Sequence, residues 1–148
     1  MVNVYLDTSA LVKLYIEETG TARVLAAVDA AEGAQVIITD ISRVESRSAI
    51  RRRERASDVS GTEANQILKQ IERDVSSFFL VQPTSSALLE EALRLIDRYP
   101  LRAYDAVQLA GCLVVRDSLS GPVTFVCADA QLCQAAEQEG LTTLNPPV

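Results

Sequence analysis

Short apolar runs that favour β-strand alternate with helical segments along the whole chain, and this alternation constrains the fold more than any other feature. Runs rich in Val, Ile, Phe and Thr predict strands at residues 2–6, 35–39, 78–81, 123–127 and 142–144. The intervening patterns predict helices at 10–16, 21–31, 41–56, 60–77, 88–98, 103–117 and 130–139. Such alternation is typical of β-α-β units. We therefore expect an α/β protein whose mostly parallel sheet is covered by helices on both faces.

The length of the chain and its cysteine content limit the class of protein. A chain of 148 residues suits one domain, 1–148, that folds without a metal or a disulfide. The apolar runs are shorter than the ~20 residues that span a bilayer, and the N-terminus lacks an export signal, so we expect a cytoplasmic protein without a membrane segment. Cys112, Cys127 and Cys133 are odd in number and lack C-x-x-C spacing, which indicates reduced core residues.

The chain contains no histidine, and this absence excludes several kinds of active site. Nucleophilic systems that rely on a Ser-His or Cys-His pair are excluded, and so are histidine metal sites. A histidine pair acting as general acid and base on RNA is excluded as well. If the chain is an enzyme, carboxylates with bound cations are the leading candidates for its chemistry.

Two acidic residues follow predicted strands. Asp7 comes directly after the first strand, and Asp129 follows the strand at 123–127 by one residue. Ligands of parallel sheets bind beyond the carboxyl ends of the strands, so both acids are candidate ligand-binding residues. Taken singly, each is more simply interpreted as the N-cap of the next helix, and the two roles are compatible. Asp40 also follows a strand, and a helix cap is its simpler interpretation.

Asp105 lies inside a predicted helix, in the segment LRAYDAVQLA. Leu101 and Leu109 are four residues before and after it, so the spacing places this acid on an apolar stripe. A carboxylate buried among aliphatic side chains is costly unless it has a partner. That partner is either a cation bound at a functional site or an arginine in a structural salt bridge, with Arg102 and Arg98 as candidates.

Glu45 also lies on the apolar side of its predicted helix, four residues after Ile41. Ser42 precedes it with the spacing of a capping box, so a purely structural role at a helix start is a real alternative.

The functional hypothesis joins these four carboxylates in one cleft. Carboxylates that converge repel one another unless a counter-charge is present. Oxygen ligands select hard cations such as Mg²⁺ or Mn²⁺. Two such ions can bind a phosphodiester, generate hydroxide from water and stabilise the leaving oxygen, without any histidine.

Four segments resemble the PIN-domain nucleases and, among them, the VapC-like toxins of bacterial toxin–antitoxin pairs. The segments are VYLDTSALVKLY, SRVESRSAI, LRAYDAVQLA and FVCADAQLCQAAEQEGL, in the family's order and covering essentially the whole chain. They place the family's four acids at Asp7, Glu45, Asp105 and Asp129, as catalytic and metal-binding residues. By the same resemblance, Ser9 either supports a metal ligand or contacts the metal through a bridging water, although a simple helix-start hydroxyl is an alternative.

The resemblance implies a fold, an activity and partners. The fold is a three-layer α/β/α sandwich around a parallel sheet. The activity is Mg²⁺- or Mn²⁺-dependent endonucleolytic cleavage of RNA. The partners are a second copy of the chain, in a homodimer, and a small antitoxin protein whose tail enters the active site. This chain has Ala130-Gln131 where many relatives carry Lys or Arg, which affects the expected phosphate contact there and not the metal site.

Arginines recur every four residues along the predicted helix at 41–56. Arg43, Arg47 and Arg51 belong to this stripe, Arg52 lies beside it, and six of the 14 basic residues fall in this region of a chain with net charge −6. The arginines are interpretable as contacts for RNA phosphates, as contacts for an antitoxin, or as a solvated helix face. These three alternatives stay open at this point.

Two other functions compete with the toxin. A catalytically idle PIN fold would serve as a binding or scaffold protein, since fold does not determine function. A PIN nuclease of RNA maturation or decay would cut RNA without an antitoxin. The presence of all four acids disfavours the idle scaffold, because an idle site has no reason to keep mutually repelling charges.

Overall fold

A computed structural model describes residues 2–147 and contains a five-stranded sheet in the order β3-β2-β1-β4-β5. The strands are β1 (Asn3–Leu6), β2 (Val36–Thr39), β3 (Leu80–Gln82), β4 (Val123–Val126) and β5 (Thr142–Leu144). Every neighbouring pair is parallel, and in the central pairs Val4 is opposite Val36 and Tyr5 is opposite Phe125. The mostly parallel sheet expected from the sequence is therefore confirmed.

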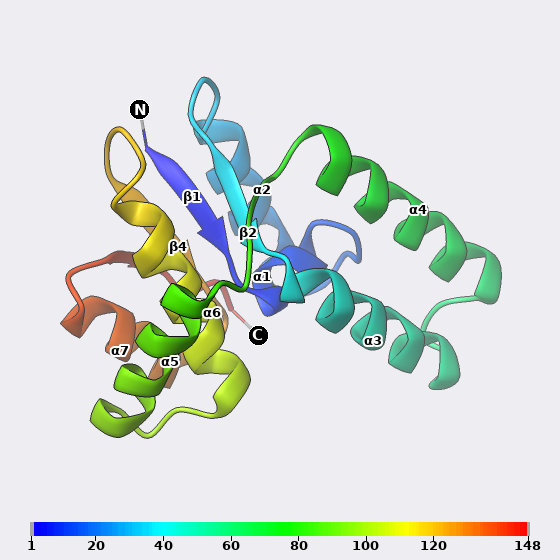
Figure 1. Ribbon diagram of the computed structural model, residues 1–148. Helices are drawn as coiled ribbons and strands as arrows, with labels where there is room; N and C mark the ends of the chain where they lie inside the picture. The colour runs from blue at the N-terminus through cyan, green and yellow to red at the C-terminus, as the bar shows by residue number, and fades with distance from the viewer. Residues whose placement is uncertain (1, 148) are drawn as a thin grey trace.

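Helices cover both faces of this sheet (Figure 1). They are α1 (Thr8–Lys13), α2 (Thr21–Ala30), α3 (Ile41–Arg55), α4 (Gly61–Ser77), α5 (Ser86–Arg98), α6 (Ala103–Arg116) and α7 (Ala130–Gln138). Side chains alternate along β1, so Tyr5 packs with the residues of α5, α6 and α7, whereas Val4 and Leu6 pack with those of α1 and α2. The fold is the expected α/β/α sandwich.

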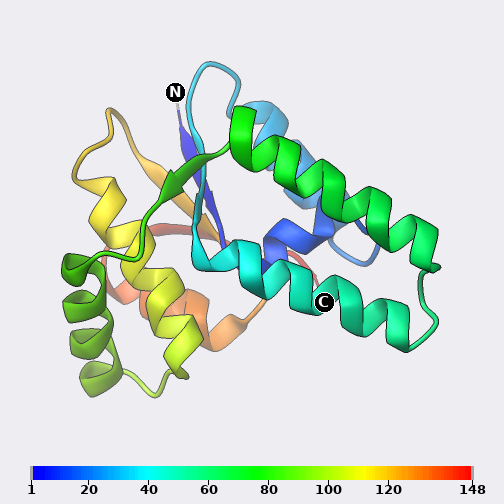
Figure 2. The same cartoon turned by 45° about the vertical axis from the view of Figure 1, so that its right-hand side comes forward.

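Helices α3 and α4 form an antiparallel hairpin that extends beyond the sheet (Figures 1 and 2). A separate apolar cluster stabilises the hairpin. Ile50 of α3 and Leu68 and Ile71 of α4 pack against Val12 of α1 and Ile16, which follows that helix. Because this cluster lies beside the main core, α3 presents one side to the sheet end and another to α4.

The sequence predicted most element ends to within two residues. The largest error is at α1, which was predicted at 10–16 and ends at Lys13, three residues early. A second error, at β3, has a clear physical cause. The predicted strand at 78–81 is wrong by two residues at its start, because α4 continues to Ser77 and the backbone N–H of Phe78 still donates to Asp74 at 2.8 Å. The capping box of Ser60 and Glu63 at the start of α4 is confirmed.

The order of the strands reverses beside β1. The chain builds β1, β2 and β3 toward one edge and then returns to place β4 and β5 on the other side of β1. In parallel sheets such a switch point leaves a crevice at the carboxyl ends of the two central strands. Asp7 directly follows β1, and Asp129 follows β4 by three residues. The topology therefore brings these two acids to the same crevice.

The cysteines are core residues, as expected. Cys112, Cys127 and Cys133 are buried and free, although the Sγ atoms of Cys127 and Cys133 lie 2.9 Å apart. Within residues 2–147, none of the helices has both the length and the hydrophobicity needed to cross a bilayer.

Gly111 allows close packing of α6 against the centre of the sheet, and we predict that Gly111→Ala destabilises the protein. A Cβ at this position would lie 2.6 Å from the Tyr5 hydroxyl oxygen and 2.9 Å from Cγ2 of Thr39, both in the interior. Overpacking of this kind costs about 1–3 kcal/mol, which exceeds the gain in helix propensity of roughly 1 kcal/mol. Urea unfolding measures the loss.

Gly61→Ala at the start of α4 is the matched control, because its Cβ would meet only Glu54 Oε2, at 3.4 Å. An unfolding free energy for Gly111→Ala equal to that of Gly61→Ala would contradict the tight contact.

Candidate functional site

A pocket of about 1050 Å³ lies at the carboxyl end of the sheet and brings the four predicted acids together. Asp7 reaches it from the end of β1, Glu45 from α3, Asp105 from the start of α6 and Asp129 from the loop after β4. The remaining lining residues are Thr8, Ser9, Ile41, Val44, Ser48, Ala49, Arg52, Arg102, Tyr104, Gln108 and Ala128. Four segments that are far apart in the sequence therefore meet in one acidic hollow.

Asp7 is the buried acid of the pocket, with a relative exposure of 5%. Its Oδ1 caps α1, accepting from the Ala10 N–H at 2.9 Å, and accepts from the Ser9 hydroxyl at 2.7 Å. Oδ2 accepts no hydrogen bond from residues 2–147. Every fully buried side-chain oxygen in these residues has a hydrogen-bond partner, so Oδ2 is not fully buried and faces accessible space. The cap interpretation is confirmed, and it leaves one oxygen for a ligand.

Asp129 repeats this arrangement at the start of α7. Its Oδ1 accepts from the N–H groups of Gln131 at 2.8 Å and Leu132 at 3.1 Å. The Ser9 hydroxyl also accepts from the Ala128 N–H at 3.1 Å, while it donates to Asp7. Ser9 therefore ties the loop that carries Asp129 to the end of β1 and is more than a helix-start hydroxyl.

Glu45 is held by side chains from two other elements. Its Oε1 accepts from the Thr8 hydroxyl and from Nε2 of Gln108, both at 2.9 Å. Gln108 is 3% exposed, and its Oε1 accepts from the Tyr5 hydroxyl at 3.2 Å. Ser42 lies inside α3, so the capping box considered for Glu45 is wrong. The carboxylate is oriented toward the pocket by a buried polar network.

Asp105 is less buried than its apolar stripe suggested. It is the third residue of α6, and its side chain is 29% exposed. Its ion-pair partner is Arg102, whose Nε lies 3.9 Å from Oδ2 of Asp105. Arg102 is itself almost fully exposed, and an exposed ion pair of this length stabilises a fold little. Arg98 pairs with Glu139 instead. The structural salt bridge is therefore a weak explanation of this acid.

Burial, and to a lesser degree the neighbouring acids, raise the pKa values of Asp7 and Asp105. Burial raises the pKa of Asp7 from 3.8 to about 7; hydrogen bonds from Ser9 and Ala10 lower it, and the charges of Asp105 and Glu45 raise it further. Partial burial raises the pKa of Asp105, followed by the charge of Asp129, with Arg102 opposing. Removal of protons near neutral pH would leave a site that attracts cations.

The arginines of α3 divide between two surfaces. Arg52 lines the acidic pocket, where it donates to the Ser48 hydroxyl at 3.2 Å and has no carboxylate partner in residues 2–147. Arg43 and Arg47 face α4 instead, with Glu72 at 2.9 Å and 4.0 Å. Arg51 pairs with Glu54 at 2.6 Å. Of the four predicted contact residues, only Arg52 lies at the pocket.

Asp40 occupies the N-cap position of α3, but its carboxylate makes no cap hydrogen bond. It accepts instead from the backbone N–H of Thr84 at 3.2 Å and from the Thr84 hydroxyl. The side-chain cap considered for Asp40 is therefore wrong; this acid fixes the loop after β3.

Comparison with protein families identifies the chain. The PIN domain family model matches residues 4–137. The chain belongs to the PIN domain family. No curated protein sequence matches this PIN domain.

Solved structures with the same fold cover nearly the whole PIN domain. FitAcB from Neisseria gonorrhoeae aligns with a TM-score of 0.68 at 18% identity, covering 96% of each chain. VapBC2 from Rickettsia felis, in a structure bound to a DNA fragment from the VapBC2 promoter, aligns with a TM-score of 0.66 at 12% identity, covering 98% of each chain. PAE2754 from Pyrobaculum aerophilum aligns at 0.66 and 22% identity, covering 97% of this chain and 92% of that one. At these identities the likeness shows the shared fold.

The donor set of this PIN domain fits a hard divalent cation. All four acids supply oxygen, and Oδ2 of both Asp7 and Asp129 is left without a hydrogen bond from residues 2–147. In the part of the chain that the structure describes, no group of three or more acidic or cysteine side chains is placed to hold a metal ion. Mg²⁺ commonly binds through one or two carboxylates and keeps several waters, so an open arrangement suits it.

Sequence reasoning did not identify Gln108 and Tyr5 as part of this site. The available signal was spacing: Gln108 lies three residues after Asp105 and therefore on the same side of α6. A glutamine in such an apolar helix needs a polar partner when it is buried. Only the fold shows that its partners are Thr8, Ser42 and Glu45.

We predict that Asp7→Asn removes a pH-dependent loss of stability. Because the pKa of Asp7 is about 7 in the folded protein and 3.8 ordinarily, the folded state binds more protons between these values. The free energy of unfolding therefore falls as pH rises from about 4 to about 7. Asn stays neutral and also caps helices well, so the variant is more stable at pH 8, by up to roughly 4 kcal/mol.

Urea unfolding at pH 4, 6 and 8 in EDTA measures this difference. Asp97→Asn, at an exposed position of α5, is the control for removal of one negative charge. If the unfolding free energy of Asp7→Asn changes with pH in the same way as that of the parent, Asp7 is not the group that causes the loss of stability.

Proposed function

We propose that this PIN domain is a divalent-metal-dependent endoribonuclease in which Asp7, Glu45, Asp105 and Asp129 bind Mg²⁺ or Mn²⁺. The observation that carries the proposal is the convergence of these four carboxylates, with no matching set of cations, in the crevice where the strand order reverses. Such a site must either take up protons or bind cations. A histidine-free pocket of this composition suits phosphodiester hydrolysis assisted by metal.

Each protein group in the pocket has a distinct task. When bound, the metal would activate water and stabilise the oxygens around the phosphorus. Asp7 and Asp129 present a free oxygen because their other oxygen is fixed by helix caps. Gln108 and Thr8 occupy Oε1 of Glu45 and so set the direction of Oε2. Arg52, without a carboxylate partner in residues 2–147, would contact a phosphate of the substrate.

The cellular role that we propose is that of a toxin held inactive by a small antitoxin, in the cytoplasm and as a homodimer. The four resembling segments support this role, and so does the fold shared with FitAcB and with VapBC2. Light scattering of the purified chain tests the homodimer, and co-expression with the product of an adjacent small gene tests the antitoxin. A maturation nuclease would show neither an antitoxin nor toxicity on expression.

We predict that Asp105→Asn abolishes cleavage of RNA by the purified protein. A metal ligand should matter more than its supporting residues, whose loss typically lowers activity 10–100-fold, so we expect a fall of more than about a hundredfold. The assay uses structured and single-stranded RNAs with Mn²⁺, Mg²⁺ or EDTA, and Asp97→Asn is the charge-matched control. Full activity of folded Asp105→Asn would show that this residue is not a metal ligand needed for cleavage. If the parent cleaves no RNA with any metal, the idle scaffold is favoured instead.

We also predict that Gln108→Leu weakens binding of Mn²⁺ by about 10–100-fold, because Glu45 loses a hydrogen bond that orients it. Titration calorimetry with Mn²⁺ measures the affinity directly. Gln134→Leu, on the exposed side of α7, is the matched control. Thr8→Val removes the other donor to Glu45 with less disturbance of the core and should weaken binding in the same direction. Unchanged affinity in both variants would show that this network does not serve a metal.

A further inference from the structure

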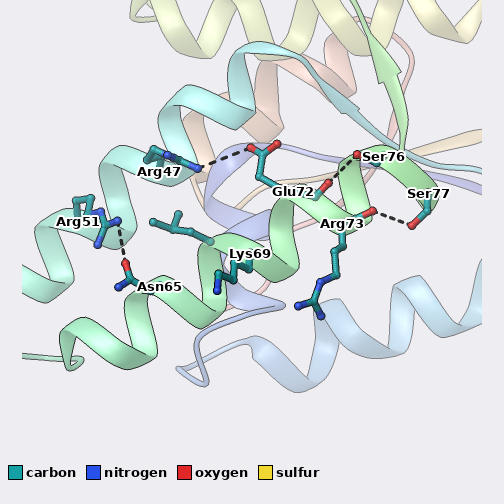
Figure 3. Close-up of a pocket in the computed structure, with 9 residues that line it drawn as sticks. Arg47, Arg51, Asn65, Lys69, Glu72, Arg73, Ser76 and Ser77 are labelled. Atoms are coloured by element: carbon teal, nitrogen blue, oxygen red, sulfur yellow. Dashed lines mark hydrogen bonds and ion pairs between the residues drawn. The ribbon is translucent and has the colours of Figure 1, made fainter.

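A second hollow, of about 860 Å³, lies on the α3–α4 hairpin and contains none of the four acids of the carboxylate pocket (Figure 3). Arg47 and Arg51 reach it from α3, and Asn65, Lys69 and Arg73 reach it from α4. Leu68, Glu72, Ser76 and Ser77 complete the lining. The hollow is thus a polar groove between two facing helices, above the apolar cluster that joins them.

The charges of this groove are unevenly matched. Four cations and one anion, Glu72, line it, although the whole chain carries a net charge of −6. Lys69 has no ion-pair partner among residues 2–147, and neither has Arg73, whose guanidinium donates only to Gln70 at 3.4 Å. An acidic protein that binds a polyanion needs a local surplus of positive charge of this kind.

A third hollow connects the groove to the carboxylate pocket. It shares Arg47 and Glu72 with the groove, and it shares Ile41, Val44 and Ser48 with the carboxylate pocket. One surface therefore runs across α3, from the carboxylates on one side to the cations on the other. A helix with its side chains is about 10–12 Å wide, so a polymer cut at the carboxylates would need several units to reach the groove.

We infer that the α3–α4 groove binds backbone phosphates of the RNA strand whose cleaved bond lies in the carboxylate pocket. This inference rests on the proposed function. It adds a second site, distant from the cleaved bond, at which the protein binds the substrate. Arginine and lysine are the residues that bind phosphate, and no aromatic side chain lines the groove for base stacking. Binding there depends on charge and not on base identity. Among the residues that line the groove only Leu68 is apolar, which suits a phosphate backbone better than a protein segment, because protein interfaces usually have an apolar core.

The binding test compares two variants that each lack two positive charges of the parent. Lys69→Ala/Arg73→Ala alters the groove, and Arg23→Ala/Arg98→Ala alters exposed positions on α2 and α5. Affinity for a long single-stranded RNA is measured in EDTA over a range of salt concentrations. We expect the groove variant alone to bind about tenfold more weakly and its salt slope to fall by about 0.7 for each RNA phosphate that the protein no longer neutralises. Equal weakening in both variants would overturn the inference.

The cleavage test varies the length of the RNA. Short oligonucleotides that fill only the carboxylate pocket should be cut equally by the parent and the groove variant, whereas a long RNA should show a higher KM in the groove variant. Unchanged KM on the long RNA would overturn the inference and leave the nuclease intact. Weaker RNA binding by the groove variant in EDTA, with no cleavage by the parent in any metal, would support the groove and contradict the nuclease.

An acidic peptide is the remaining alternative for the groove. If an oligo-glutamate peptide binds the parent but not the groove variant, and RNA affinity is the same for both, the groove is a peptide site and the inference is wrong.

Discussion

Repulsion among four carboxylates at the switch point of the sheet is the constraint on which the rest of this site depends. The parallel topology delivers Asp7 and Asp129 to the ends of adjacent strands, and the helices on either side add Glu45 and Asp105. Burial then raises the pKa of Asp7 to about 7, so in the folded protein this carboxyl gains and loses its proton near neutral pH. Natural sequences tolerate such a local conflict mainly at functional sites. A bound cation would resolve the conflict.

A continuous chain of contacts joins this site to the core. The lack of a side chain at Gly111 leaves room for the hydroxyl of Tyr5 beneath α6. That hydroxyl donates to Gln108, which in turn donates to Glu45. Because Tyr5 and Gln108 are both buried, a packing change at α6 is transmitted to a carboxylate in the pocket. Buried polar groups of this kind fix a geometry when all of them are satisfied, as they are in residues 2–147.

The sequence predicted those features that depend on local pattern. Alternating apolar runs indicated the parallel sheet, and the acids at strand ends indicated two members of the pocket, because topology alone brings them together. The depth of Asp105 was overestimated, because Leu101 lies before the start of α6 and so does not extend the apolar stripe past the first, more open turn, where Asp105 lies. Gln108 escaped notice because its partners lie 63 to 103 residues away in the chain. Hydrogen bonds between residues far apart in the chain produce no periodic sequence pattern from which they could be predicted.

Helix α3 divides the chemistry of the molecule into an acidic side and a basic side. Glu45 faces the carboxylate pocket, whereas Arg47, two residues later, faces α4, as a helix of 3.6 residues per turn requires. Arg47 and Arg51 are thereby kept away from the acids, and of the arginines of α3 only Arg52 lines the carboxylate pocket. The same separation places positive charge on a surface that is continuous with the pocket, where it would attract a polyanion. Because Lys69 and Arg73 of α4 lie beside Arg47 and Arg51, the basic side of α3 belongs to a groove built from two helices.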